Sequence, residues 1–251
     1  MINEMSIAVA YQDNVLTLET QETSLSPISK ALALNYSLPM TYITQYAEAL
    51  NDVVLGWFVS YFQAACEPNE EIVLSDADVF EEICLSKHQW YKIRKTLIEK
   101  GFLRCRKQGR QAFYSLDEDN IELALRQVQN MLAPVIDINR LIAKTLIHQQ
   151  GLSIKSVILF AYFIQNLPYL NMAERTEDSP PTLFCQDAIV ADTFLSKAEI
   201  KAAVRDLKKL NLITIGHQRD KDFVVLHMGV LGKLTAQYCQ LHLGGDEDAA
   251  C

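Results

Sequence analysis

Residues 85–103 read LSKHQWYKIRKTLIEKGFL, and this stretch decides the fold. Ser86 is one of the residue types that most often cap the start of a helix. Apolar residues follow it at Trp90, Ile93 and Leu97, the i, i+3, i+7 spacing of one helix face. Gly101 stands where a glycine typically ends a helix. The stretch therefore predicts an amphipathic helix with one buried and one exposed face.

The residues on both sides of this helix predict the rest of a small unit. Downstream, Leu103 and Cys105 alternate with arginines, which is typical of a strand, and Cys105 is expected on its buried side. A turn at 108–111 then returns the chain as a second strand. Upstream, Asp76 or Asp78 can cap a short helix around 79–83. The expected order is helix, strand, helix, helix and hairpin, over residues 41–66, 72–74, 79–83, 86–100 and 103–116.

The same pattern returns 110 residues later, where 195–213 read LSKAEIKAAVRDLKKLNLI. The triplet LSK recurs, Leu97 corresponds to Leu207, and the register holds upstream without a gap. A second unit is therefore expected, with a strand at 182–185, a helix at 196–210 and a hairpin from 212 to 227. Identity between the two stretches is modest, which leaves chance or convergence as alternatives, but two duplicated units are the better interpretation of this repeat.

Helix, strand, helix, helix and hairpin is the order of a winged helix-turn-helix. The predicted fold class is therefore mainly α with small β wings (α+β): two tandem winged-helix domains joined by a helical linker. The residues LSKHQ, Leu97, GFL at 101–103 and YSL at 114–116 resemble winged-helix domains of phage and plasmid replication initiators and of bacterial transcription regulators. The resemblance covers roughly 40–117 and 153–228. Arg94 departs from it, because that helix position is usually aliphatic.

The predicted boundaries follow from these units. Residues 1–39 form an N-terminal segment in which 6–12 and 15–20 offer a hairpin, and 244–251 form a disordered tail. The first domain spans 40–117, the helical linker 118–150 and the second domain 151–243. Within the linker, helices are expected at 120–132 and 137–149. Apolar residues recur along the linker and along the last helix, and they suit a rigid connector, a domain core or the seam of a homodimer. They are Ile121, Leu125, Val128 and Leu132 in the linker, and Leu231, Leu234 and Tyr238 in the last helix.

Positive charge is concentrated in the first unit. Residues 85–114 hold nine Lys or Arg and one acid, in a chain of net charge −8. An acidic protein with one strongly basic segment often binds nucleic acid there. In a winged helix, the exposed face of the second helix enters the major groove and the wing contacts the neighbouring backbone. The predicted DNA-binding residues are therefore Lys87, His88, Tyr91, Lys92 and Lys95 on the helix, and Arg104, Arg106, Lys107 and Arg110 on the wing.

The second unit is less basic, with seven cations and four acids between 195 and 222. Glu199 and Asp206 on its helix would meet phosphates unfavourably, which favours a protein partner for this unit. The predicted function is non-catalytic binding of double-stranded DNA, in transcription regulation or in phage or plasmid replication, with a homodimer presenting two copies of the basic helix. The alternative is a winged-helix adaptor that binds proteins and no DNA.

Catalytic signatures are missing from the sequence. The nine glycines form neither GxGxxG nor GxxxxGK, and no HExxH or other metal-ligand spacing is present. The six cysteines form no CxxC pair and stand mostly among apolar residues, which predicts buried free thiols. No secretory signal or membrane-spanning stretch is found. We therefore expect no enzyme, no cofactor, no metal and no membrane partner, and a cytoplasmic location.

Overall fold

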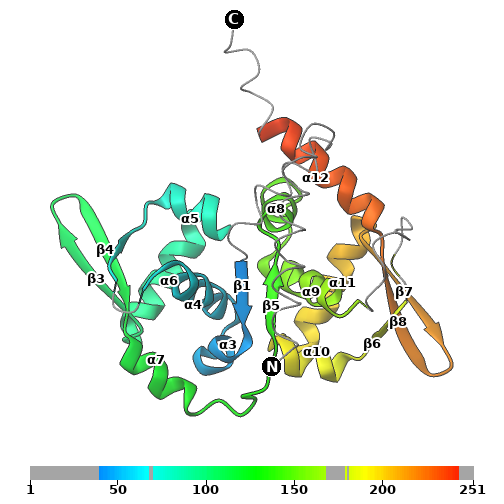
Figure 1. Cartoon of the computed structure of the whole chain (residues 1–251), viewed down its shortest axis with the longest axis horizontal. Coiled ribbons are helices and arrows are strands. Elements are labelled where there is room, and N and C mark those ends of the chain that lie inside the picture. The colour runs from blue at the N-terminus through cyan, green and yellow to red at the C-terminus, as the bar shows by residue number, and fades with distance from the viewer. Residues whose placement is uncertain (1–39, 68–69, 168–178, 180, 243–251) are drawn as a thin grey trace, which may run out of the picture.

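The structure is a computed structural model that describes residues 40–67, 70–167, 179 and 181–242. The hairpin predicted within 1–39 and the tail 244–251 lie outside the described residues. The fold is of the mixed α+β class, with helices and small antiparallel sheets arranged in two units on either side of a central pair of strands (Figure 1).

The first unit begins with a strand and two helices, and a helix follows its hairpin. Its elements are β1 (Met40–Ile43), α3 (Thr44–Leu50), α4 (Val53–Ala65), β2 (Ile72–Val73), α5 (Asp76–Ile83), α6 (Lys87–Glu99), β3 (Leu103–Gln108), β4 (Gln111–Leu116) and α7 (Glu118–Leu125). The single helix predicted over 41–66 is therefore wrong. Asn51 adopts a left-handed conformation with φ 52°, and the Asp52 carboxylate accepts hydrogen bonds from the Val54 and Leu55 amides to start α4.

The second unit repeats this order. Its elements are β5 (Val135–Ile138), α8 (Arg140–Lys144), a π-helix (Thr145–Gln149), α9 (Ile154–Gln165), β6 (Thr182–Phe184), α10 (Gln186–Thr193), α11 (Lys197–Lys209), β7 (Ile213–Gln218), β8 (Lys221–Leu226) and α12 (Met228–His242). From α10 to β8, each element starts 110 residues after its counterpart, as α11 at Lys197 does relative to α6 at Lys87. The predicted spacing of the repeat is thus confirmed in the arrangement of the elements.

The two three-stranded sheets share one topology. Their strand orders are β2-β4-β3 and β6-β8-β7, and all neighbours are antiparallel. Leu103 pairs with Leu116 in the first sheet, and Ile213 pairs with Leu226 in the second. The turn between the two helices before each hairpin also matches, because Cys84 and Phe194 are both left-handed, with φ 58° and 59°. Bulky residues seldom adopt this conformation, so its recurrence at equivalent positions indicates a common backbone.

Aromatic side chains fill the core of the first unit. Trp90 on α6 is 1% exposed, stacks at a tilt on Phe58 of α4 and meets the edge of Tyr114 on β4. The Nε1 of Trp57 donates to the backbone oxygen of Ile83 at 2.9 Å, which ties α4 to the end of α5. Trp90 therefore lies on the buried face of α6, as the apolar spacing predicted, and it packs against the leading helix α4.

A two-stranded sheet joins the units. β1 belongs to the first unit and β5 leads into the second, and they pair antiparallel from Met40 with Ile138 to Ile43 with Val135. The segment 118–150 is consequently only partly helical. The helix predicted over 120–132 is wrong beyond α7, which ends at Leu125. Asn139 caps α8 by accepting from the Ile142 amide. The predicted helix at 137–149 thus begins at Arg140.

The two predicted dimer seams are largely occupied within the chain. Ile121 and Val128 are 5% and 8% exposed, and Leu231 and Tyr238 are 4% and 6% exposed. These side chains belong to the interior of the molecule, which is the core alternative that the sequence left open. Leu132 is the exception, because it is 94% exposed.

Candidate nucleic-acid interface

Helix α6 starts and ends where the sequence predicted. The Ser86 hydroxyl accepts from the Gln89 amide at 3.3 Å, and the Gln89 side chain accepts from the Ser86 amide at 2.9 Å. This reciprocal capping box satisfies two backbone donors that a helix start leaves free. At the other end, Gly101 has φ +76°, a conformation that glycine adopts without strain. Trp90, Ile93 and Leu97 face inward and are buried, so the opposite face is fixed toward solvent.

The exposed face of α6 carries the five predicted helix residues. Tyr91 is 58% exposed, and His88 and Lys92 are exposed as well. Lys92 makes no side-chain hydrogen bond or ion pair with any described residue. The other two cations have acidic neighbours: Lys87 Nζ lies 2.9 Å from Asp76, and Lys95 Nζ lies 3.8 Å from Glu99. Both pairs are solvent-exposed and contribute little to stability, so the lysines can turn to another anion.

The base of the β3–β4 wing holds two tightly paired arginines. Arg104 donates from Nε and Nη2 to one oxygen of Asp117, at 2.9 Å and 2.7 Å. Arg106 donates to both oxygens of Glu71 and lies over the ring of Phe113, 4.6 Å from its centroid. Hydrogen bonds from Arg106 and Arg104 lower the pKa of Glu71 and of Asp117, respectively, below the ordinary values. These carboxylates therefore stay ionised at neutral pH and hold both guanidinium groups to the protein.

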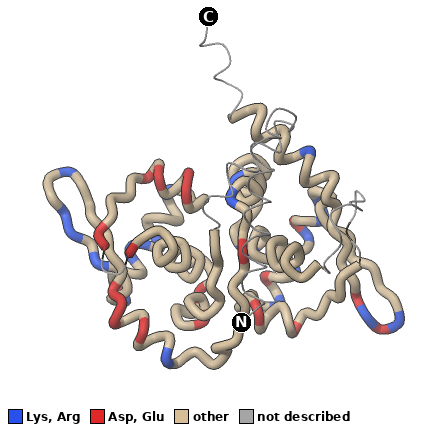
Figure 2. Tube along the Cα trace, in the orientation of Figure 1, with Lys and Arg blue, Asp and Glu red and all other residues tan. Residues whose placement is uncertain are grey.

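The tip of the wing is different. Lys107 and Arg110 are exposed and make no side-chain hydrogen bond or ion pair within the described part of the chain. Gly109, with φ +61°, makes the tight turn between the strands and lifts both residues away from the body of the unit. Figure 2 shows Lys and Arg along this projecting hairpin, and Asp and Glu on α5 and α7 nearby. The free positive charge of the wing thus lies at its tip.

Arg94 makes contacts within the first unit that the sequence analysis did not predict. Its Nη1 donates to the Tyr114 hydroxyl at 3.0 Å, and its guanidinium lies 5.7 Å from the ring centroids of both Trp90 and Tyr91. It therefore links α6 to the central strand of the sheet and supports the Tyr91 ring from one side. The signal was available, since aromatic residues three and four positions before an arginine lie on the same helix face.

The cysteines only partly meet the expectation of buried thiols. Cys84 is buried, and burial raises its pKa to about 12, so that thiol stays protonated. Cys105 and Cys185 are exposed. The predicted burial of Cys105 is wrong because β3 is the edge strand of a projecting wing, where neither face is covered beyond Leu103.

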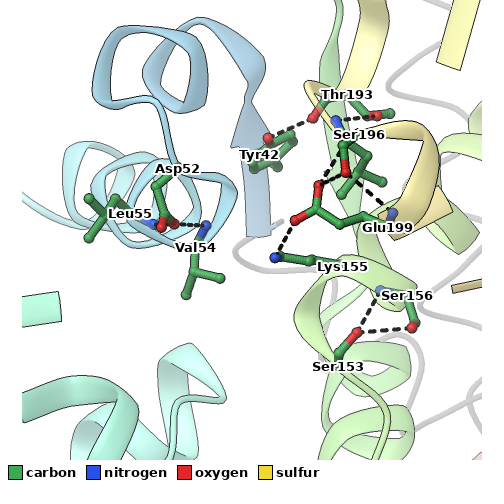
Figure 3. Close-up of polar contacts among 11 residues, drawn as sticks. Tyr42, Asp52, Val54, Leu55, Ser153, Lys155, Ser156, Thr193, Ser196 and Glu199 are labelled. Carbon is green, nitrogen blue, oxygen red and sulfur yellow. Dashed lines mark hydrogen bonds and ion pairs between the residues drawn. The ribbon is translucent and has the colours of Figure 1, made fainter. Parts of the chain in front are cut away.

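Helix α11 of the second unit carries an acidic residue, Glu199, whose carboxylate has partners within the unit. Glu199 accepts from Lys155 Nζ of α9 at 2.5 Å and from the Ser196 backbone amide at 2.8 Å (Figure 3). Burial acts to raise the pKa of Glu199, but these hydrogen bonds outweigh it and the pKa is lowered. The carboxylate is therefore paired within the unit, while its side chain stays 31% exposed. That it would meet phosphates unfavourably stays a prediction.

The chain matches no protein-family model, and no curated protein is similar enough in sequence to count as a relative. Within the described residues, no group of three or more His, Cys, Asp or Glu is placed to hold a metal ion. No described helix combines the length and the apolar character needed to cross a membrane.

Proposed function

We propose that the chain binds double-stranded DNA without catalysing a reaction on it, through α6 and the tip of the β3–β4 wing. Both units would be winged helices in tandem, on the basis of their element order, their β2-β4-β3 and β6-β8-β7 sheets and the short left-handed turn before α6 and α11. In this fold the second helix of the helix-turn-helix enters the major groove, and the wing reaches an adjacent stretch of backbone.

One observation carries the proposal: among the described residues of the first unit, the cations whose side chains have no partner all lie on the two elements that a winged helix presents to DNA. Lys92 lies on the exposed face of α6, and Lys107 and Arg110 lie at the wing tip. The arginines nearer the body, Arg104 and Arg106, are held by carboxylates instead. If these cations only faced solvent and bound no ligand, there would be no reason for the unpaired cations to lie on α6 and the wing tip and the paired arginines to lie nearer the body.

Each group has a role that follows from its chemistry. Lysine and arginine bind phosphate oxygens and the acceptor atoms of guanine, and the Tyr91 and His88 rings offer flat surfaces and hydrogen-bonding atoms to sugars and base edges. Arg104 and Arg106 are already paired with Asp117 and Glu71, so we expect them to contribute less to phosphate binding than the tip does. The DNA contact would serve transcription control or mobile-element replication in the cytoplasm.

The test is the affinity for a fluorescently labelled duplex, measured by anisotropy at fixed salt. Lys92→Glu with Lys95→Glu replaces two attractive charges by repulsive ones, so we expect binding to weaken by at least about a hundredfold. Lys233→Glu on α12 is the control for a single charge reversal, because it changes an exposed lysine on another element. Unaltered affinity of the double variant, with an unchanged circular dichroism spectrum, would remove α6 from the interface.

A protein-binding adaptor is the second candidate, and the acidic helices beside the wing favour it. Asp76, Asp78, Glu118 and Asp119 all lie in the first turns of α5 and α7. A net charge of −8 also opposes DNA at long range. If the wild-type chain binds no duplex even at low salt, the adaptor becomes the better proposal.

We propose in addition that the chain works as a homodimer, which would present two copies of α6 to neighbouring half-sites, and that its second unit can dock a protein partner.

A further inference from the structure

We infer that two copies of this chain associate through the connector between α7 and β5, with Met131 and Leu132 of each copy at the centre of the contact. This inference rests on the homodimer proposed above and names its surface. The connector spans residues 126–134 and runs along the edge of the molecule between the two units (Figure 1).

Exposed apolar side chains are concentrated here. Ten large hydrophobic residues are exposed in the described part of the chain, and four of them fall between positions 123 and 135. Leu132 is 94% exposed, Met131 63%, Leu123 57% and Val135 44%. Single exposed hydrophobic residues are ordinary on protein surfaces, whereas a concentration of them marks an interaction site.

The connector's backbone is held in place from both units. Gln45 of α3 donates to the oxygens of Met131 and Ala133, at 3.3 Å and 2.9 Å. The Glu48 side chain accepts from the Gln129 amide at 2.8 Å, and Asn130 donates to the Ala191 oxygen of α10 at 2.9 Å. Met131 and Leu132 are therefore displayed on a fixed backbone. Ordering such a surface on binding costs little, because its conformation is already set.

The charge pattern identifies a second copy as the occupant. Residues 127–136 read QVQNMLAPVI and contain no charged side chain, in a chain whose net charge is −8. Two identical acidic molecules repel each other over most of their surfaces, and they approach most easily where neither carries charge. A two-fold axis through this segment brings Leu132 of one copy against Met131 and Leu132 of the other, the self-complementary arrangement of a closed dimer.

The position of the connector is compatible with the proposed DNA contact. The β3–β4 wing projects from the opposite side of the first unit (Figure 1). Contact through the connector therefore leaves both wing tips open, so a dimer can hold DNA there while it remains assembled.

Light scattering coupled to size exclusion tests the inference on the full chain, from about 1 to 100 µM. We expect a dimer for the wild type. Leu132→Asp places two like charges at the two-fold axis, so we expect the dimer dissociation constant to rise at least about a hundredfold. Met131→Lys should act in the same direction with a charge of the other sign. Leu241→Asp is the matched control, because Leu241 is 71% exposed but lies on α12, and it should leave the dimer intact.

Loss of the dimer in Leu132→Asp would not reflect misfolding, because a side chain that is 94% exposed contributes almost nothing to the core. The thermal unfolding of this variant should therefore match that of the wild type. A monomeric wild type, or a dimer that survives both Leu132→Asp and Met131→Lys, overturns the inference. DNA binding is scored separately, by anisotropy with a short duplex that accepts one protomer. A monomeric Leu132→Asp should still bind it, so a failed interface and a failed DNA proposal give different results.

Discussion

Tyr42 ties the two units together, and its hydroxyl gives the sharpest test of how they cooperate. Tyr42 on β1 is fully buried, and its hydroxyl donates to the Thr193 backbone oxygen at 2.8 Å, across 151 positions of sequence (Figure 3). Burial holds the pKa of Tyr42 far above its ordinary value, so the hydroxyl keeps its proton and remains a donor. Thr193 is the last residue of α10, where helix carbonyls lack partners within the helix.

The Tyr42→Phe substitution keeps the ring and removes only this hydrogen bond. It leaves the Thr193 carbonyl buried without a partner, which costs about 1–3 kcal/mol of unfolding free energy. For a chain of 251 residues, each kcal/mol lowers Tm by roughly 2–4 °C, so we expect a fall of about 2–12 °C. The neighbouring Thr44 hydroxyl donates to the Asp192 backbone oxygen at 2.6 Å, so the same helix end receives donors from two residues of the first unit.

Differential scanning calorimetry measures this directly. The described units should unfold in one transition that moves as a whole in Tyr42→Phe, because the end of α10 depends on β1. Tyr46→Phe on α3 is the matched control, since the Tyr46 hydroxyl bonds to no described residue, and its Tm should stay close to that of the wild type. Equal Tm values for the two variants, or two separate transitions, would refute the reasoning.

Three further substitutions probe other parts of the fold. Trp90→Ala should lower the unfolding free energy by about 3–5 kcal/mol in urea titration, because it empties a fully buried site. Gly56→Ala would bring a methyl group within 2.6 Å of the Ala47 backbone, so α3 and α4 must move apart and stability should fall by about 1–3 kcal/mol by the same titration. The pKa of Glu199 is lower in the folded protein than in the unfolded chain, where it is about 4.3. Its pairing with Lys155 therefore stabilises the protein above that unfolded pKa, and this stabilisation is lost as the pH falls below it. Glu199→Gln should therefore flatten the loss of stability in thermal scans between about pH 5 and 3.

Local patterns were enough to predict the repeated part of each unit. The capping serines, the inward spacing of Trp90, Ile93 and Leu97, and the alternating hairpin are signals contained within a few residues of one another, and the structure places α6, β3 and β4 accordingly. The 110-residue repeat extended these predictions to α11, β7 and β8.

Features that depend on distant partners escaped prediction. β1 is a strand because β5 pairs with it from nearly a hundred positions away, and the local pattern instead predicted residues 41–43 as the start of a helix. The same limit applies to the candidate site. Exposure of Lys92 and Tyr91 follows from helical phase, whereas the pairing of Arg106 with Glu71 and of Glu199 with Lys155 depends on how separate elements pack.

The salt dependence of duplex binding tests the central claim most directly. Each cation that replaces a counterion on the phosphates adds about 0.9 to the slope of log K against log salt concentration. Lys92→Ala with Arg110→Ala removes two unpartnered cations, so the slope should flatten by about 1.8 relative to the wild type. Arg106→Ala removes a cation already held by Glu71 and should leave the slope nearly unchanged. A wild-type affinity that does not respond to salt, or a double variant with the wild-type slope, would contradict DNA binding through α6 and the wing tip.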